Sequence, residues 1–201
     1  MIRSSVAALA VAAITSVSTP VFSADTETAI FAGGCFWCVE SDFDVVDGVI
    51  STTSGYIGGK GENPTYYDHS SRGWREAVRI EFDPAKVSYS QLLDSFFRSV
   101  DPTDAGGQFC DRGHSYTTAV YATSSEQAKA AEMAKDAAQT ELGKAVVTPI
   151  ETATKFYAAE DYHQDYHNKN PLRYKYYRYS CGRDKSVKAL WGTAARRGLG
   201  S

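Results

Sequence analysis

Hydrophobic and polar residues between positions 28 and 191 follow, segment by segment, the period of a strand or of a helix. Short apolar or alternating runs predict strands over residues 28–32, 76–82, 116–122 and 146–154. Apolar residues at helical spacing predict helices over residues 35–43, 88–97, 124–142, 160–168 and 185–191. The irregular alternation of strands and helices favours an α+β (two-layer α/β) domain with one mixed sheet flanked by helices.

Local signals support two of the helix boundaries. Ser88 followed by Gln91 is the pattern of a capping box, and Gly143 is a typical residue just after a helix end. The chain shows no internal repeat, low-complexity tract or linker. We therefore expect a single domain with its functional site on loops beside the sheet.

Composition is ordinary for a soluble globular domain. The chain has 201 residues, of which 43% are hydrophobic and 22% charged. Its formal charge of −3 and its isoelectric point near 5.8 create no field that would attract nucleic acid or an anionic membrane. Partners must therefore be inferred from a specific site.

The first 24 residues have the pattern of a secretory signal peptide. Arg3 precedes an apolar run over residues 6–17, and small residues lead to a cleavage site near Ala24. The run is too short for a dependable membrane span. We expect residues 1–24 to be removed on export and residues 25–201 to form the catalytic domain in the periplasm or outside the cell. Thiols in such a compartment pair unless they are reduced.

Two cysteines stand three residues apart in the stretch AGGCFWCVE, residues 32–40. Gly33 and Gly34 allow a sharp turn before Cys35, and a position in the first helical turn would favour its thiolate form. Three interpretations remain open for Cys35 and Cys38: a disulfide-exchange pair, half of a metal site, or a catalytic thiol with a resolving partner. An inert buried cysteine is the structural alternative.

Glu76 is a second unusual residue. It shares the alternation face of Val78, Ile80 and Phe82, so a strand directs its carboxyl to the apolar side. A buried carboxyl stays protonated near neutral pH and can donate a proton. Alternation alone favours the alternative of a glutamate at the strand end that turns to solvent, and a nearby thiolate is what would favour the buried acid.

Six motifs occur in order along the chain and are together more specific than a pair of cysteines. They are GGCFWC at 33–38, SGYIGG at 54–59, NPTY at 63–66, REAVRIEFDP at 75–84, DPTD at 101–104 and AEDYHQDYHNKNP at 159–171. The series resembles type A peptide methionine sulfoxide reductases, which act on methionine S-sulfoxide. The resemblance implies a ferredoxin-like (plait-type) core and a long, coil-rich C-terminal segment.

The resemblance also implies a role for each residue of one site. Cys35 would attack the sulfoxide sulfur and Glu76 would protonate the sulfoxide oxygen. The residues that would hold or support this oxygen are Tyr66, Asp111 and Tyr116. The methyl group of the substrate would lie against Phe36 and Trp37.

The implied cycle needs no metal and no bound cofactor. Methionine S-sulfoxide, free or in proteins, would leave a sulfenic acid on Cys35, and a second thiol would condense with it to form an intramolecular disulfide. An external thioredoxin-like dithiol would then reduce this disulfide. Such an enzyme repairs oxidised proteins as a monomer, without nucleic acid or membrane partners after signal cleavage.

The resolving thiol is open at this point. Cys38 lies on the same helical turn as Cys35, whereas many relatives have Gly there and use a cysteine in the C-terminal tail, here Cys181. Cys110 is another departure from the commoner pattern. We prefer a structural bridge between Cys110 and Cys181, which leaves Cys35 and Cys38 as the working pair.

Two rival classes use some of the same residues. A thioredoxin-like disulfide exchanger would contain the C-x-x-C pair but would have no need of Glu76. A zinc protein would need a second close pair of ligands, and the spacing of the four Cys and four His residues does not provide one. The order of the six motifs favours the reductase over both.

Overall fold

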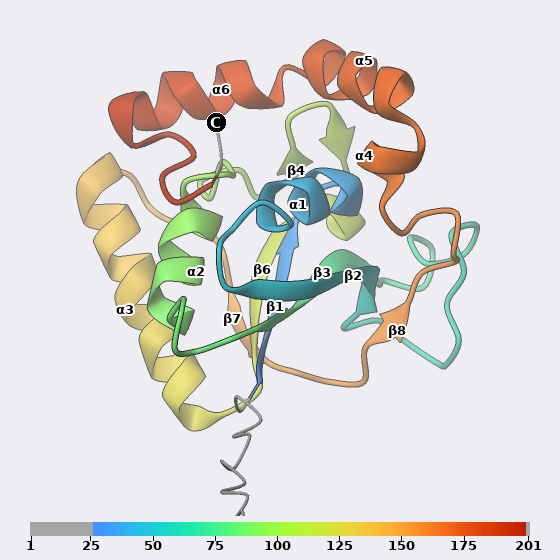
Figure 1. Ribbon diagram of the computed structural model, residues 1–201, viewed down its shortest axis with the longest axis horizontal. Helices are drawn as coiled ribbons and strands as arrows, with labels where there is room; N and C mark the ends of the chain where they lie inside the picture. Colours follow the sequence, from blue (N-terminus) through green and yellow to red (C-terminus); the bar gives the residue numbers. More distant parts are fainter. Residues whose placement is uncertain (1–25, 200–201) are drawn as a thin grey trace, which may run out of the picture.

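The computed structural model describes residues 26–199, so the predicted signal peptide lies outside the described residues (Figure 1). The elements in chain order are β1 (Glu27–Gly33), α1 (Phe36–Phe43), β2 (Val49–Ile57), β3 (Arg75–Phe82), α2 (Tyr89–Phe97), β4 (Gly107–Gln108), β5 (Asp111–Arg112), the 3-10 helix η1 (His114–Tyr116), β6 (Thr118–Ala122), α3 (Ser125–Leu142), β7 (Ile150–Thr152), β8 (Tyr157–Ala158), α4 (Tyr166–Lys169), α5 (Pro171–Cys181), α6 (Arg183–Trp191) and the 3-10 helix η2 (Gly192–Ala194). Among residues 26–199, no helix has the length and apolar character needed to cross a membrane.

The central strands have the ferredoxin-like order. The sheet runs β7-β6-β1-β3-β2-β8, and its four middle strands are antiparallel neighbours. Helix α1 connects β1 to β2, and α2 lies in the connection from β3 to β6. β7 pairs parallel to β6, which makes the sheet mixed. The predicted α+β fold with a plait-type core is therefore confirmed.

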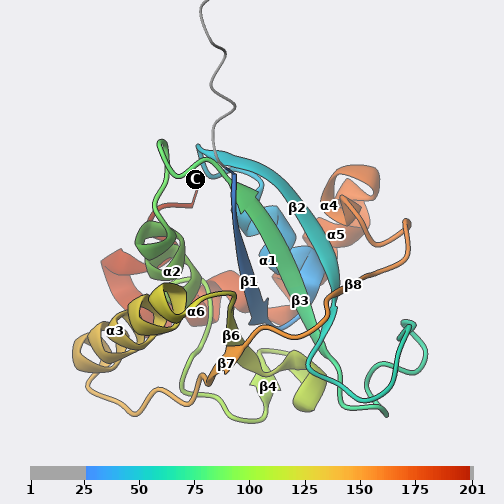
Figure 2. The same ribbon diagram turned by 90° about the horizontal axis from the view of Figure 1, so that it is seen from below.

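The two faces of the sheet are covered differently. Helices α1 and α2 pack on one face, where the ring of Phe31 from β1 stacks on Phe96 at a centroid distance of 4.8 Å. The opposite face holds a smaller cluster around Ile30 and Tyr121, against which Phe156 packs. Figure 2 shows the segment between β7 and β8 crossing this second face. Consecutive residues of β1 thus enter opposite cores, as strand alternation requires.

Helix ends follow the local sequence signals. The Ser88 side chain accepts the amide of Gln91, whose own side chain accepts the amide of Ser88, so the predicted capping box is present. α3 ends at Gly143, which has the left-handed conformation typical of a helix C-terminus. These two helices begin and end where the sequence predicts.

Other predicted boundaries are wrong. A helix over 160–168 does not form, because Asp165 has a left-handed backbone (φ 53°) and α4 begins only at Tyr166. The side chain of Gln164 instead bonds both backbone groups of Ser54. The strand predicted over 116–122 begins at Thr118, because Tyr116 closes the 3-10 turn η1. The strand predicted over 146–154 is limited to β7.

The C-terminal segment is more helical than predicted. Most of residues 153–165 lacks regular structure, apart from the short strand β8, but residues 166–191 form α4, α5 and α6. The expectation of a long, coil-rich segment is wrong for this second part. Pro171 occupies the first turn of α5, where its missing N–H costs no helical hydrogen bond. β2, β8 and α5 were not predicted from the sequence.

A buried carboxylate ties the C-terminal helices to α1. Asp42 is fully buried and lies 2.9 Å from the Arg178 guanidinium, 2.6 Å from Arg196 and 3.7 Å from Arg183. Arg183 also donates to the carbonyl of Gly33, directly before the α1 turn. This network fixes the region after α5 against the first helix.

We expect Asp42→Asn to lower the free energy of unfolding by about 3 kcal/mol, because it leaves the buried Arg183 guanidinium without a counter-charge and leaves Arg178 and Arg196 with Asp184 alone. Urea unfolding at neutral pH measures the change. The matched control Asp47→Asn removes the same charge from an exposed site on the loop after α1 and should change stability by less than about 0.5 kcal/mol. Equal stabilities of the two variants would contradict this role of Asp42.

Candidate active site

A small cavity of about 60 Å³ lies between α1, β3 and α5. Eight side chains line it: Cys35, Phe36, Trp37, Tyr66, Glu76, Asp111, Tyr116 and Tyr177. The first seven of these were predicted from the sequence, and Tyr177 was missed. Cys38 lies beneath Cys35 on α1 and does not line the cavity, and Cys110 and Cys181 stand beside it. Residues from distant parts of the chain therefore meet in one place.

Cys35 is the residue directly before α1. Its carbonyl accepts the amide of Cys38, and its side chain is 6% exposed. The preceding Gly34 has φ +87°, and a Cβ there would lie 2.7 Å from the Gln108 side chain. The turn therefore requires glycine, and it places the Cys35 sulfur at the floor of the cavity.

The pKa values of Cys35 and Cys38 are shifted in opposite directions. Burial raises the pKa of Cys35 well above its usual value, and its contact with Cys38 adds to this. The hydrogen bond from Cys35 lowers the pKa of Cys38, and the nearby charges of Arg183 and Arg178 lower it further. Burial therefore opposes the thiolate form of Cys35 that its position at the helix N-terminus predicts.

Glu76 points into the helix side of the sheet, so the solvent-facing alternative that alternation alone favoured is wrong. Its side chain is 2% exposed, and its Oε2 accepts the backbone N–H of Phe36 at 3.0 Å. Burial raises the pKa of Glu76 to about 8, although the Phe36 amide and the Tyr116 hydroxyl both act to lower it. At pH 7 the carboxyl is protonated and can act as an acid beside Cys35.

Aromatic rings form one wall of the cavity. The Trp37 ring stacks on Tyr166 at 3.8 Å with an interplanar angle of 8°, and its Nε1–H donates to His163 Nδ1 at 3.1 Å. The ring of Phe36 lies 5.0 Å from that of His163. These contacts hold both rings in fixed positions, which suits the binding of a small apolar group.

Hydroxyl and carboxyl groups form the opposite wall. The Tyr177 hydroxyl donates a short hydrogen bond to Asp111 Oδ2 and contacts the Cys35 thiol. Burial raises the pKa of Asp111 and raises the pKa of Tyr66 to about 12. Tyr116 is likewise kept protonated by burial. The cavity therefore offers several hydrogen-bond donors around one thiol.

A disulfide lies at the back of this wall. Cys110 and Cys181 are bonded to each other, and Cys35 and Cys38 are the free thiols of the described residues. The preferred pairing is confirmed. The Cys181 sulfur is 3.8 Å from Asp111 Oδ2. The bridge thus anchors α5, and with it Tyr177, to the segment that carries Asp111.

Three residues near the cavity were not assigned a role from the sequence. Tyr177 belongs to a tyrosine-rich helix, where nothing in the spacing marks one ring as different. His163 receives the Trp37 hydrogen bond. His69 lies behind Glu76, with its Nε2 3.6 Å from Glu76 Oε1. His163 lies inside the motif at 159–171 and His69 lies three residues after the motif at 63–66, but the Trp37 and Glu76 side chains that they face come from other segments.

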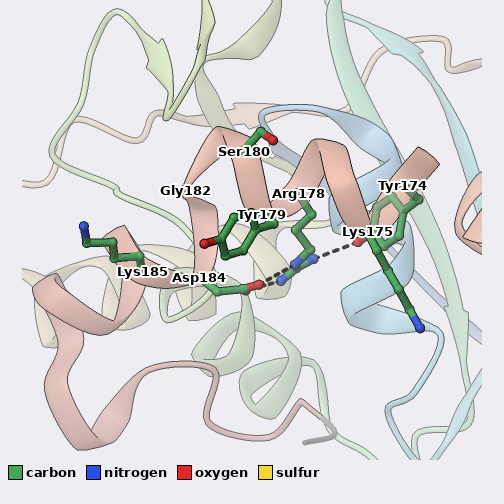
Figure 3. Close-up of a pocket in the computed structure, with 8 residues that line it drawn as sticks. All are labelled: Tyr174, Lys175, Arg178, Tyr179, Ser180, Gly182, Asp184 and Lys185. Atoms are coloured by element: carbon green, nitrogen blue, oxygen red, sulfur yellow. Dashed lines mark hydrogen bonds and ion pairs between the residues drawn. The ribbon is translucent and has the colours of Figure 1, made fainter. Parts of the chain in front are cut away.

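A larger hollow, of about 510 Å³, lies at the junction of α5 and α6. Figure 3 shows that the Arg178 guanidinium inside it is paired with Asp184 and with the Tyr174 hydroxyl. None of the groups that surround the Cys35 thiol lines this hollow. Among the described residues, the Cys35 thiol and the Glu76 carboxyl therefore meet in the smaller cavity.

Comparisons with known proteins identify the family. The family model described as peptide methionine sulfoxide reductase matches residues 27–195. The chain belongs to this family. It is 56% identical over 180 residues to peptide methionine sulfoxide reductase MsrA 2 of Rhizobium meliloti (strain 1021), covering 90% of this chain and 91% of that one.

Solved structures show the same fold. Mxr1 from Saccharomyces cerevisiae in reduced form has a TM-score of 0.70 at 30% identity, covering 74% of this chain and 88% of that chain. Mxr1 has also been solved in complex with Trx2; that structure shares the fold with a TM-score of 0.53 at 23% identity, covering 74% and 90% of the two chains. Membership of the reductase family argues against the disulfide-exchange and zinc interpretations of Cys35 and Cys38.

The donor set is also a poor fit for zinc. Among the described residues, one group lies close enough together to hold a metal ion: Cys110, Asp111 and Cys181. Its two sulfurs are bonded to each other and offer no thiolate. In this member of the reductase family, Cys110 and Cys181 therefore form a disulfide, and Cys35 and Cys38 are free thiols.

The division of cysteines predicts the number of reactive thiols. In denaturant without reductant, a thiol reagent should modify two groups, Cys35 and Cys38, and after reduction it should modify four. The Cys110→Ser/Cys181→Ser double variant should lose about 2–5 kcal/mol of stability because the unfolded chain gains freedom. Peptide mapping that finds Cys35 or Cys38 bonded to Cys181 in the unreacted protein would contradict the assignment.

Proposed function

We propose that this member of the reductase family reduces the S epimer of methionine sulfoxide, free or in proteins, with Cys35 as nucleophile and Glu76 as acid. The observation that carries the proposal is the presence of a buried, protonated carboxyl and a buried thiol in the same small cavity. Sulfoxide reduction needs both groups. The thiol sulfur is the nucleophile, and the acid protonates the oxygen as its bond to the methionine sulfur breaks. Phe36 and Trp37 would bind the methyl group.

In the first step the Cys35 sulfur attacks the sulfoxide sulfur while Glu76 protonates the sulfoxide oxygen, and this oxygen then passes to the Cys35 sulfur. The methionine S–O bond breaks, the Cys35 S–O bond forms, and Glu76 supplies the proton of the new sulfenic acid. Methionine sulfur is reduced by two electrons and Cys35 sulfur is oxidised by two. Hydrogen bonds from Tyr66 and Tyr116 would hold the oxygen toward Glu76 during this transfer.

The Cys35 thiol must lose its own proton in this step. The Tyr177 hydroxyl contacts the thiol and donates to Asp111, whose raised pKa suits a carboxylate that takes up a proton. We propose that the thiol proton passes to the Tyr177 oxygen while the Tyr177 proton moves to Asp111. The thiolate thus forms when the substrate is in place, rather than in the resting protein.

We propose Cys38 as the resolving thiol. It is free, contacts Cys35 and has a lowered pKa, whereas Cys181 is held by Cys110. Attack of the Cys38 thiolate on the Cys35 sulfenic acid forms the Cys35–Cys38 disulfide, and the oxygen leaves as water after gaining a proton. An external thioredoxin-type dithiol would then reduce this disulfide and restore both thiols.

The setting of this reaction follows from the remaining sequence features. We propose that residues 1–24 direct export, that the domain of residues 25–201 works in the periplasm or outside the cell, and that it acts as a monomer in the repair of oxidised proteins. The pairing of Cys110 with Cys181 is consistent with an oxidising compartment. We expect no bound cofactor or metal, and no nucleic acid or membrane partner after cleavage.

Glu76→Gln should lower the rate of S-epimer reduction by about 10²–10⁴-fold, because glutamine cannot donate the required proton. Cys35→Ser should abolish reduction, and the intact enzyme should not reduce the R epimer. Turnover of separated sulfoxide peptides with dithiothreitol measures all three. The matched control Glu81→Gln, on the same strand, should retain full activity.

Stability separates a chemical role of Glu76 from misfolding. The folded pKa of about 8 exceeds the usual unfolded value, so between these two values the native carboxyl lowers stability as pH rises. Glu76→Gln removes this penalty and should unfold no more easily than the intact protein at pH 8. Full activity of a folded Glu76→Gln protein would overturn the acid assignment.

Cys38→Ser should release one methionine per enzyme and then stall as the Cys35 sulfenic acid when thioredoxin is the reductant. The Cys110→Ser/Cys181→Ser protein should continue to turn over at a rate within about threefold of the intact enzyme. Trapping with dimedone and mass spectrometry detects the stalled species. Normal cycling of Cys38→Ser, together with stalling of Cys181→Ser, would move the resolving role to Cys181.

A further inference from the structure

His69 is a buried histidine that the proposed cycle does not use. It lies in the turn between β2 and β3 and is 3% exposed. Its ring stacks between those of Tyr56 and Tyr66, at centroid distances of 5.0 and 5.7 Å. Its Nε2 lies 3.6 Å from Glu76 Oε1. The role of this imidazole depends on which nitrogen of His69 and which oxygen of Glu76 carries a proton.

The partners of His69 determine its tautomer. Nδ1 is 2.9 Å from the backbone carbonyl of Tyr66, which can only accept, so Nδ1 carries the proton. Burial lowers the pKa of His69, so the ring is neutral at pH 7. Nε2 therefore presents a lone pair. It faces Glu76 and, at 3.2 Å, the hydroxyl of the exposed residue Ser70.

The partners of Glu76 determine which of its oxygens is protonated. Oε2 accepts the Phe36 amide at 3.0 Å, so the proton of the neutral acid belongs on Oε1. Oε1 is the oxygen that faces the His69 lone pair. At 3.6 Å the two atoms are slightly too far apart for a hydrogen bond, and a small rotation of the neutral carboxyl closes the gap before any substrate binds.

We propose that His69 is a positioning residue for Glu76: its neutral imidazole holds the acidic proton on Oε1 until the substrate oxygen takes it. This inference rests on the proposed acid role of Glu76. A hydrogen bond from Glu76 to the imidazole stabilises the protonated form of Glu76. Removal of the imidazole should therefore lower the pKa of Glu76, so that it ionises at lower pH.

Other titratable groups around His69 would feel its loss. They are Tyr66 and Asp68 in its own turn, Tyr56 on β2, Glu76 on β3, and Glu160 and His163 in the segment after β8. The substitutions at His69 therefore replace its neutral ring with a neutral amide. No charge is introduced or removed at pH 7.

The test uses two amides that replace different halves of the imidazole. His69→Asn keeps a donor near the position of Nδ1 for the Tyr66 carbonyl and removes the group that faces Glu76. His69→Gln places an amide oxygen near the position of Nε2 and gives up the bond to Tyr66. His114→Asn, at an exposed histidine, is the matched control. Circular dichroism and thermal unfolding establish that each variant is folded.

Infrared titration of the protonated carboxyl gives the decisive readout. Its C=O band is assigned to Glu76 by its absence in Glu76→Gln. In His69→Asn we expect the band to disappear about one pH unit lower than in the intact protein, a tenfold change in the ionisation constant. His69→Gln and His114→Asn should titrate as the intact protein does. Ser70→Ala should titrate no lower, because it removes a competitor for Nε2.

Kinetics accompany the titration. His69→Asn should lower kcat for the S epimer at pH 8 with KM unchanged. A band that titrates at the same pH in folded His69→Asn and in the intact protein would overturn the proposal, as would a His69→Gln protein that titrates as low as His69→Asn. Loss of the acid role itself would be seen separately, as full activity of Glu76→Gln.

Discussion

The hydrogen bond from the Phe36 amide to Glu76 Oε2, 3.0 Å long, is the contact on which the site depends. It joins the first turn of α1 to the start of β3, two segments forty positions apart in the sequence. Because Cys35 immediately precedes Phe36, the same contact brings the nucleophile to the acid. It also satisfies one oxygen of a carboxyl that has left water, so that burial can raise its pKa without leaving both oxygens unpaired.

Helix α1 separates a neutral environment from a charged one. Cys35 faces a cavity of protonated tyrosines, aromatic rings and a protonated acid, where burial favours its thiol form. Cys38 is close to Arg178 and Arg183, whose charges favour its thiolate. In the first environment the hydroxyl groups of the cavity can replace the water that hydrogen-bonds the oxygen of a sulfoxide, and in the second a thiolate is favoured. The two sulfurs of one helical turn thus suit consecutive steps of a single cycle.

The sequence predicted the parts of this arrangement that depend on short-range patterns. The capping box at Ser88 and the end of α3 at Gly143 follow from neighbours within one helical turn, whereas the burial of Glu76 was favoured only by the resemblance that places a thiol beside it. The resemblance to the reductase family supplied seven of the eight cavity residues, five of which lie inside the six motifs. The pairing of Cys110 with Cys181 was preferred from the oxidising compartment that the N-terminal residues predict, and the structure contains it.

Features that rest on long-range contacts could not be predicted in the same way. Residues 160–164 contain helix-forming side chains, but Gln164 bonds the backbone of Ser54 on β2, and residues 161–165 form turns instead of a helix. The position of Tyr177 depends on a disulfide and on Asp42, neither of which marks one tyrosine among its neighbours on α5. The pKa of Cys35 depends on its burial among residues from distant segments, which its neighbours in the sequence do not show.

The central claim is that one cavity orients a methionine sulfoxide between the Cys35 sulfur and the Glu76 carboxyl. The most direct measurement is a crystal structure of the Cys35→Ser variant with a peptide that contains methionine S-sulfoxide. We expect the sulfoxide oxygen within hydrogen-bond distance of Glu76 and of a tyrosine hydroxyl, with the methyl group against Phe36 and Trp37. A sulfoxide bound with its oxygen directed away from Glu76, or with its methyl group outside the aromatic wall, would contradict the account.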